Sequence, residues 1–227
     1  MEERMPALFI GHGSPMNAIE ESAFSRAWEA QAASIRRPRA IVCISAHWET
    51  QGAAVTAMDH PRTIHDFYGF PQELYDVEYP APGSAELVAA VRGLGDGPAV
   101  TADREWGLDH GTWSVVRRMY PRADVPVVQL SLDRGLDMRG HYDLGRRLAP
   151  LRDRGYLVIG SGNIVHNLRV MDFSRKGGHL FAGAAVQDDG FGSPAQGGTG
   201  GVKGRIPAAD HGDSFSQDHF LAQADIP

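Results

Sequence analysis

Short apolar runs alternate with longer amphipathic stretches along most of the chain. The segments 7–15 and 40–49 each hold an apolar run that stops at a histidine, and the segments 125–132 and 156–163 follow a similar pattern. An unbroken apolar run bounded by glycine, proline or polar residues is typical of a strand buried on both faces of a parallel sheet. Shorter strands are expected at 53–58 and 99–103.

Helical stretches separate these strands. Residues 18–37, between the first two strands, have helical composition, and a right-handed strand–helix–strand unit makes its two strands parallel. Ser84 is a candidate N-cap for a helix that runs to Arg92, and Thr112 for one that runs to Tyr120. The pattern predicts an α/β fold: a single domain with a mostly parallel central sheet flanked by helices. A further helix is expected at 139–152, with a break at Pro150.

Histidines follow several of the predicted strands. His12 and His47 come at the carboxyl ends of the first two strands, the edge at which open α/β sheets bind ligands. His166 follows the strand at 156–163, and His110 lies in a loop just before a predicted helix. A lone histidine after a strand is usually a hydrogen-bonded turn residue. Three histidines that each follow a predicted strand, His12, His47 and His166, favour a metal or proton-transfer site.

A loop at 59–71 is rich in aromatic residues without helical spacing, and its proline and glycine residues exclude a long regular element. Phe67, Tyr68 and Phe70 are compatible with two roles. They form either a hydrophobic plug that closes the core or a wall for a flat aromatic ligand. The plug is the commoner arrangement, and the pattern alone leaves both open.

Composition narrows the class of protein. A length of 227 residues, of which 42% are hydrophobic, is enough for one domain with a substantial core. The net charge of -6 argues against a nucleic-acid surface, and no apolar run is long enough to cross a membrane. Cys43 is the only cysteine, so a disulfide within the chain is excluded and a cytoplasmic location is expected.

The pattern changes after residue 174. Residues 175–227 hold 11 glycines and 10 large apolar residues among 53, with no helical or strand period. This composition cannot bury enough apolar surface to offset the entropy of ordering. The chain is therefore divided into a patterned domain, 1–174, and an atypical Gly-rich C-terminal segment, 175–227. That segment is interpreted as either disordered or the product of a frameshift.

Five short phrases stand out between residues 6 and 174. They are GHGSP at 11–15, SAHWE at 45–49, IHDFYGFP at 64–71, GLDHGTW at 107–113 and GSGNIVHNL at 160–168. Together, and in this order, they resemble the 4,5-DOPA extradiol dioxygenase family, within the class III extradiol ring-cleavage dioxygenases of the LigB-like superfamily. Any one phrase is weak, whereas five in order are highly specific.

The resemblance implies an oxidoreductase with a non-haem Fe(II) site, often found with Zn(II) as purified, that opens a small DOPA-like catechol with O2. By this resemblance His12 and His47 are metal ligands. His166 lies at the metal, as a ligand or as an acid–base residue, and His110 is a second catalytic histidine. Such a site suits Fe(II) chemistry, because non-haem oxygenases hold the ion with about three protein ligands and leave positions open. A homo-oligomer is compatible with this picture.

The resemblance also places His65 and Tyr68 on the substrate side of the site. It further implies a metal-binding histidine near the C-terminus, where this chain departs from the family pattern. His219 keeps the following aromatic residue and leucine, and His211 is the alternative because it keeps the preceding proline and acidic residue. Neither is followed by the expected apolar helix.

Three other interpretations stay open. The chain is a non-catalytic metal-site binding protein of the same fold, as the Memo-like relatives are, or a family member inactivated by its aberrant C-terminus. A Zn hydrolase is also compatible with a histidine cluster, with Glu49 as the best available general base. The complete phrases at 64–71 and 107–113 favour the dioxygenase over the binding protein.

Overall fold

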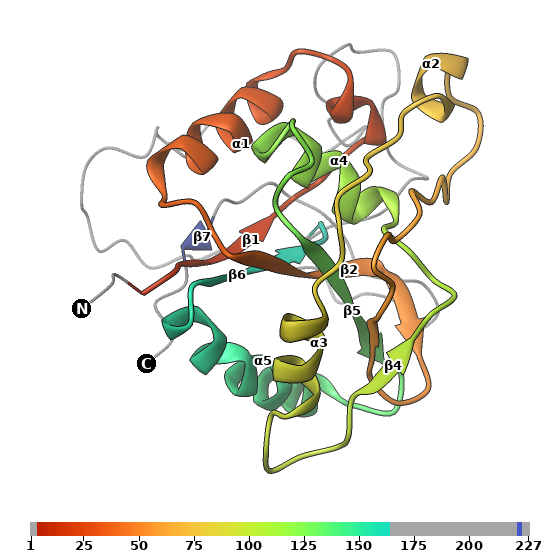
Figure 1. Cartoon of the computed structure of the whole chain (residues 1–227). Coiled ribbons are helices and arrows are strands. Elements are labelled where there is room, and N and C mark those ends of the chain that lie inside the picture. The colour runs from red at the N-terminus through yellow and green to blue at the C-terminus, as the bar shows by residue number, and fades with distance from the viewer. Residues whose placement is uncertain (1–3, 164–221, 224–227) are drawn as a thin grey trace, which may run out of the picture.

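A mixed sheet forms the centre of the molecule, with helices on both of its faces (Figure 1). The computed structural model describes residues 4–163 and 222–223. Within these residues the sheet has seven strands, in the order β4-β3-β5-β2-β6-β1-β7. The strands are β1 (Ala7–Ile10), β2 (Ala40–Thr50), β3 (Ala54–Thr56), β4 (Thr101–Asp103), β5 (Val127–Asp133), β6 (Tyr156–Ser161) and β7 (Ala222–Gln223).

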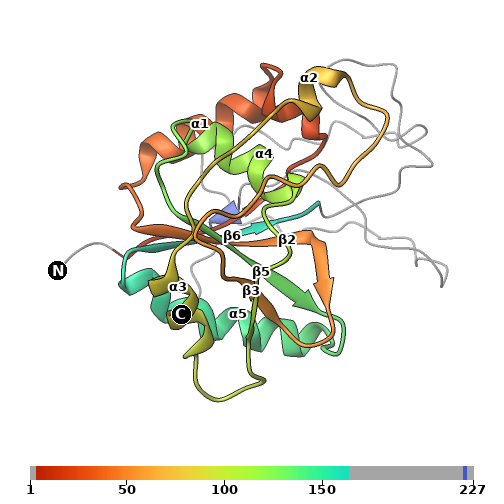
Figure 2. The same cartoon turned by 45° about the vertical axis from the view of Figure 1, so that its right-hand side comes forward.

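The helices form two layers. Helices α1 and α4 cover one face of the sheet, and α3 and α5 cover the other, as Figures 1 and 2 show from two directions. Within the described residues, none of these helices combines the length and the apolar character needed to span a membrane. The helical elements of the described residues are the 3-10 helix η1 (Pro15–Ala18) and the α-helices α1 (Ala23–Ser34), α2 (Gln72–Tyr75), α3 (Ala85–Arg92), α4 (His110–Met119) and α5 (Met138–Asp153).

The middle of the sheet is parallel. Strand β6 pairs in parallel with both β1 and β2, and β2 also pairs in parallel with β5. Strand β3 runs antiparallel to β5 but parallel to β4, and β7 is antiparallel to β1. The predicted α/β fold with a mostly parallel sheet is therefore confirmed. The strands that lead to His12 and His47, β1 and β2, both run parallel to β6, which lies between them.

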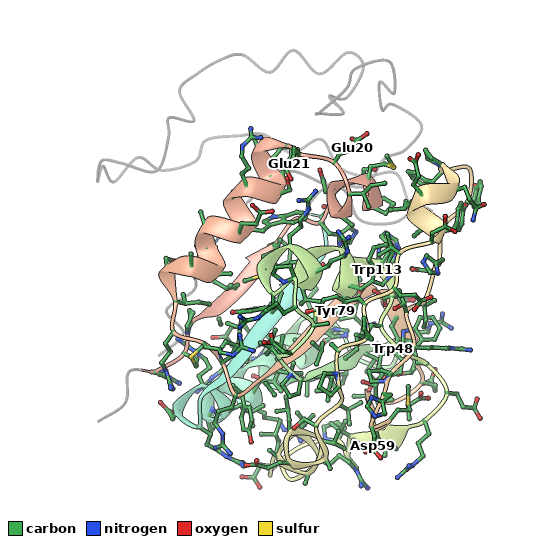
Figure 3. All side chains as sticks on the ribbon, turned by 45° about the horizontal axis from the view of Figure 1, so that its top comes forward. Glu20, Glu21, Trp48, Asp59, Tyr79 and Trp113 are labelled. Atoms are coloured by element: carbon green, nitrogen blue, oxygen red, sulfur yellow. The ribbon has the colours of Figure 1, made fainter. Side chains whose placement is uncertain are left out.

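Side-chain alternation along the strands builds two separate cores. Ile41 and Cys43 of β2 point into a core with α1 and α4, whereas Ala40 and Val42 point into a core with α3 and α5. The first core holds Trp113, which is fully buried, and Tyr79, which is 1% exposed (both labelled in Figure 3). Burial on both faces explains why these strands read as unbroken apolar runs.

Strand β2 carries a wide bulge. Ile44 pairs with Leu130 of β5, and the next pair joins Glu49 to Leu132, so residues 45–48 stand opposite the single residue Ser131. The histidine of this segment was expected at the end of the strand, whereas the strand continues past it to Thr50. Bulges re-aim side chains, and they are common next to functional sites.

Helix boundaries differ from the sequence prediction in three places. Helix α1 begins at Ala23 because Ser22 caps it, in a reciprocal capping box with Ser25. Asp109, not Thr112, is the N-cap of α4, and its side chain accepts the backbone N–H of Thr112. Helix α5 continues through Pro150, an exposed residue of its last turn, to Asp153, so the predicted break is absent. The predicted cap of α3, Ser84, is confirmed.

Removing a buried side chain of β6 should destabilise the fold strongly. Leu157 is fully buried in the core against α1 and α4, so Leu157→Ala should lower the free energy of unfolding by about 2–5 kcal/mol. Urea denaturation followed by circular dichroism measures this. The control is Met138→Ala, whose side chain is 84% exposed and whose loss should cost less than about 0.5 kcal/mol. Equal effects would contradict the packing described.

Candidate metal centre

Three histidines from different elements meet at the carboxyl edge of the sheet. His12 lies two residues past the end of β1, His47 lies in the bulge of β2, and His110 is the first residue of α4. Each offers one ring nitrogen, and these atoms all lie within 4.8 Å of one another. His12 and His110 are 2% and 6% exposed, whereas the side chain of His47 is 26% exposed. The group is therefore nearly buried, and His47 is its most exposed member.

Ser161 fixes the orientation of the His12 ring through its Nδ1 atom. The hydroxyl of Ser161 donates to the carbonyl oxygen of Gly111, so its proton is already used. Ser161 Oγ also lies 3.0 Å from Nδ1 of His12, and must therefore accept a hydrogen bond from the N–H at that position. In a neutral imidazole this leaves Nε2 of His12 with a lone pair.

Asp66 lies behind the other two histidines. Its Oδ1 is 2.9 Å from Nδ1 of His110, and its Oδ2 is 3.5 Å from Nδ1 of His47. Burial alone would raise the pKa of Asp66, but the contacts with His110 and His47 outweigh it and hold that pKa below its usual value. Asp66 is therefore a carboxylate at neutral pH.

A second, fully buried acid supports the start of α4. Asp109 accepts a hydrogen bond from the side-chain amide of Gln129 on β5, and also caps α4. Burial raises the pKa of Asp109, and the charge of nearby Asp66 acts in the same direction. The pair ties the first turn of α4, including His110, to the middle of the sheet.

Gly111 allows α4 to approach β2 closely. A Cβ at this position would lie 2.5 Å from Ser45 Oγ and 3.0 Å from Cδ2 of His47. Such separations are too short for a carbon atom, so only glycine fits here without movement of its neighbours. The close approach is what brings the imidazoles of His47 and His110 within 4.0 Å, centroid to centroid.

The donor set fits a transition-metal ion. The Nε2 atoms of His12 and His47 lie 3.0 Å apart. Two nitrogens that bind one ion at about 2.1 Å lie roughly 3–3.5 Å from each other. Imidazole nitrogen is a preferred ligand of iron, zinc and copper, so the two rings would hold such an ion through their Nε2 atoms.

A family model describes nearly the whole chain. Residues 6–222 match the model of the catalytic LigB subunit of aromatic ring-opening dioxygenase. The chain belongs to this family. The group of three histidines that could bind a metal therefore lies in a LigB-family chain. The family expected from the five sequence phrases is confirmed.

Individual relatives agree with this assignment. The LigB-family chain is 54% identical over 169 residues to the 4,5-DOPA dioxygenase extradiol of Escherichia coli (strain K12), covering 74% of this chain and 62% of that protein. It is 48% identical over 165 residues to the protein of the same name from Beta vulgaris, covering 70% of this chain and 61% of that one. The chain thus spans about three fifths of the length of these relatives.

A solved structure shares the fold. The crystal structure of an uncharacterized protein from Escherichia coli K12 superimposes with a TM-score of 0.64 at 46% sequence identity. The match covers 76% of this LigB-family chain and 65% of the solved one. The solved structure therefore supports the fold of this LigB-family chain.

The aromatic loop of this LigB-family chain contributes unevenly to the site. His65 directs Nε2 at the carbonyl oxygen of Val77, 3.0 Å away, and so helps to anchor the loop. Phe67 packs against the core as a plug, and its ring also meets His110 edge-to-face at 5.6 Å. The side chain of Tyr68 is 90% exposed. Substrate-binding roles for His65 and Tyr68 stay predictions.

Other predicted residues of the site are placed as follows. His166, His211 and His219 lie outside the described residues. Cys43 is buried in β2, and burial raises the pKa of its thiol to about 12, so it is not the thiolate that a metal needs. The sequence analysis did not single out Ser161, Asp66 or Gln129, because polar residues that support other side chains follow no pattern in the sequence.

Gly111→Ala should disturb the centre. The added methyl group collides with Ser45 and His47, so one of the two must move, and the grip on a metal ion should weaken. We expect Zn(II) affinity to fall about tenfold or more, as is usual when the support of a ligand is changed. Isothermal titration calorimetry measures it. Gly145→Ala is the control, since its Cβ would meet nothing within 4 Å. Unchanged affinity in Gly111→Ala would contradict the close approach.

Proposed function

We propose that this chain is a metal-dependent extradiol dioxygenase that opens the ring of a small catechol, DOPA-like in character, with O2. The observation that carries the proposal is the convergence of His12, His47 and His110, whose ligand nitrogens lie within 4.8 Å at the carboxyl edge of the sheet. Membership of the LigB family supports it. Relatives that are 54% and 48% identical over the matched residues are named 4,5-DOPA dioxygenase extradiol.

In this proposal His12 and His47 hold the metal, which is Fe(II), with Zn(II) able to occupy the same nitrogens. Bound iron would supply the one-electron chemistry that a catechol and O2 need in order to react. His166, and one of His219 or His211, complete the site by the sequence resemblance. All three of these lie outside the described residues.

His110 is proposed as the acid–base residue. Its ring lies beside the two proposed ligands, and the Asp66 carboxylate 2.9 Å from its Nδ1 would stabilise an imidazolium. The imidazole can therefore accept a proton from a catechol hydroxyl and return it as the ring opens. Both atoms of O2 enter the product, a semialdehyde that also carries a carboxylate. Phe67, edge-on to His110, would exclude water from that side.

The test is oxygen uptake by the full chain, loaded with Fe(II) under anaerobic conditions and then offered aerated catechols, DOPA among them. We expect uptake together with a yellow ring-opened product. Absence of uptake with every catechol, in protein shown to hold one metal ion per chain, would overturn the dioxygenase proposal and favour a binding role.

His47→Ala should abolish metal retention and reduce oxygen uptake to background, because His47 supplies one of the two Nε2 atoms 3.0 Å apart. Metal analysis after desalting and an oxygen electrode measure the two effects. His60→Ala is the matched control, since His60 is exposed and belongs to no part of the three-histidine group. Full activity in His47→Ala would refute its role as a ligand.

His110→Ala should keep the metal but slow turnover by about 10²–10⁴-fold, the usual loss when an acid–base group is removed. The comparison is the metal content and kcat of this variant against those of the wild type. If the variant loses the metal instead, His110 is the third ligand, and its proposed role in proton transfer is wrong.

A further inference from the structure

The peptide unit that follows His12 is held at both of its polar ends. The carbonyl oxygen of His12 accepts a hydrogen bond of 3.1 Å from the side-chain Nδ2 of Asn17. The N–H of Gly13, in the same peptide unit, donates to Oδ1 of Asn163 at 3.0 Å. Asn17 belongs to η1, whereas Asn163 lies two residues past the end of β6. Two segments that are far apart in the chain therefore grip one peptide unit beside a proposed metal ligand.

The chemistry of the partners fixes the orientation of both amides. A carbonyl oxygen can only accept and a backbone N–H can only donate, so Asn17 must present Nδ2 to His12 and Asn163 must present Oδ1 to Gly13. Oδ1 of Asn17 in turn accepts the hydroxyl of Ser22 at 3.1 Å. The two asparagines thus have opposite roles, because Asn17 is a donor to the peptide unit and Asn163 is an acceptor from it.

The conformation of Gly13 makes such support necessary. Its φ angle is +60°, in the left-handed region, so the chain turns sharply directly after His12. Glycine has no side chain that restricts its rotation, and the peptide unit is free to turn unless its polar ends are held. The ring of His12 is already held at Nδ1 by Ser161. Holding the backbone as well fixes the direction of Nε2, which lies 3.0 Å from Nε2 of His47.

Asn17 is itself anchored to α4. The guanidinium of Arg118, whose side chain is 11% exposed, donates from Nε to the carbonyl oxygen of Asn17 at 2.9 Å. Its Nη2 donates to the carbonyl oxygen of Glu20 at 2.7 Å. His110 is the first residue of the same helix. The helix that presents His110 therefore also holds the segment that supports His12.

We propose that Asn17 and Asn163 are positioning residues of this centre, which clamp the peptide unit between His12 and Gly13 so that His12 presents Nε2 to the metal. The inference rests on the proposed function where it treats His12 as a metal ligand. Both asparagines act only through the backbone of His12. Losing either hydrogen bond therefore weakens metal binding without removing a ligand.

A purely structural role makes a different prediction. If the asparagines only stabilised the loop after β1, their loss would lower the free energy of unfolding and leave the metal affinity of the folded protein unchanged. One substitution, made at each position, separates the two roles further. Asn163→Asp keeps an acceptor for the N–H of Gly13, and among residues 4–163 and 222–223 the Nδ2 of Asn163 has no hydrogen-bond partner to lose. Asn17→Asp replaces the donor to His12 with an oxygen that repels the carbonyl.

The experiment is a Zn(II) titration of the full chain at pH 8, where an aspartate is ionised. Asn17→Ala, Asn17→Asp and Asn163→Ala should bind Zn(II) about tenfold or more weakly than the wild type, as is usual when the support of a ligand is lost. Asn163→Asp, the matched control, should stay within about threefold of the wild type. A negative charge near the ion would by itself strengthen binding, so weaker binding by Asn17→Asp is not an effect of charge.

Co(II) gives a spectroscopic signature, since its visible absorption depends on the arrangement of its ligands. The Co(II) spectrum should change in the three weakened variants and not in Asn163→Asp. Urea denaturation shows whether each variant is folded. Equal affinities of Asn17→Asp and Asn163→Asp, or all four variants within about twofold of the wild type, would overturn the proposal.

The remaining outcomes separate this inference from the proposed function. If the Asn17 variants fail to fold, the contrast between Asn163→Ala and Asn163→Asp still decides. A wild type that binds no Zn(II) would overturn the metal centre and the clamp together. The expected pattern of affinities, without catechol cleavage by the Fe(II)-loaded wild type, would refute the dioxygenase proposal alone.

Discussion

The parallel pairing of β1 and β2 with β6 is the constraint on which the centre depends. Parallel strands end at the same edge, so two histidines 35 residues apart in the chain come to lie with their Nε2 atoms 3.0 Å apart. Helix α4 packs against η1, α1 and β2, and presents the third imidazole at that edge. The group therefore depends on strand order and helix packing, and not on any local sequence motif alone.

Buried polar partners convert this proximity into a defined geometry. Ser161 and the Asp109–Gln129 pair are buried, where an unpaired polar group would be costly, and each is satisfied by a specific neighbour. Asp66, whose side chain is 18% exposed, accepts the backbone N–H of His110. Their effect is to hold the rings in fixed orientations before any ligand arrives. Preorganisation of this kind is how a site avoids the cost of rearranging when it binds or reacts.

Much of this architecture is readable from the sequence. The unbroken apolar runs predict the parallel strands because both faces of those strands are covered, and the same runs place His12 near the end of its strand. The start of α4 was predicted three residues too late. Two good N-cap residues, Asp109 and Thr112, stand in the same stretch, and only the buried contact with Gln129 decides between them. Asp66 was missed because its importance lies in two residues that are distant in sequence.

The bulge of β2 places His47 between two regularly paired stretches of the strand. Residues 41–44 and 49–50 pair with β5 on either side of it, while His47 lies in the segment between them. Within that segment Ser45 is buried and pairs with Ser161 of β6, and Trp48 is buried as well, so the bulge is held by contacts of its own. The bulge therefore aims His47 at the other two imidazoles while the strand keeps its pairing on both sides.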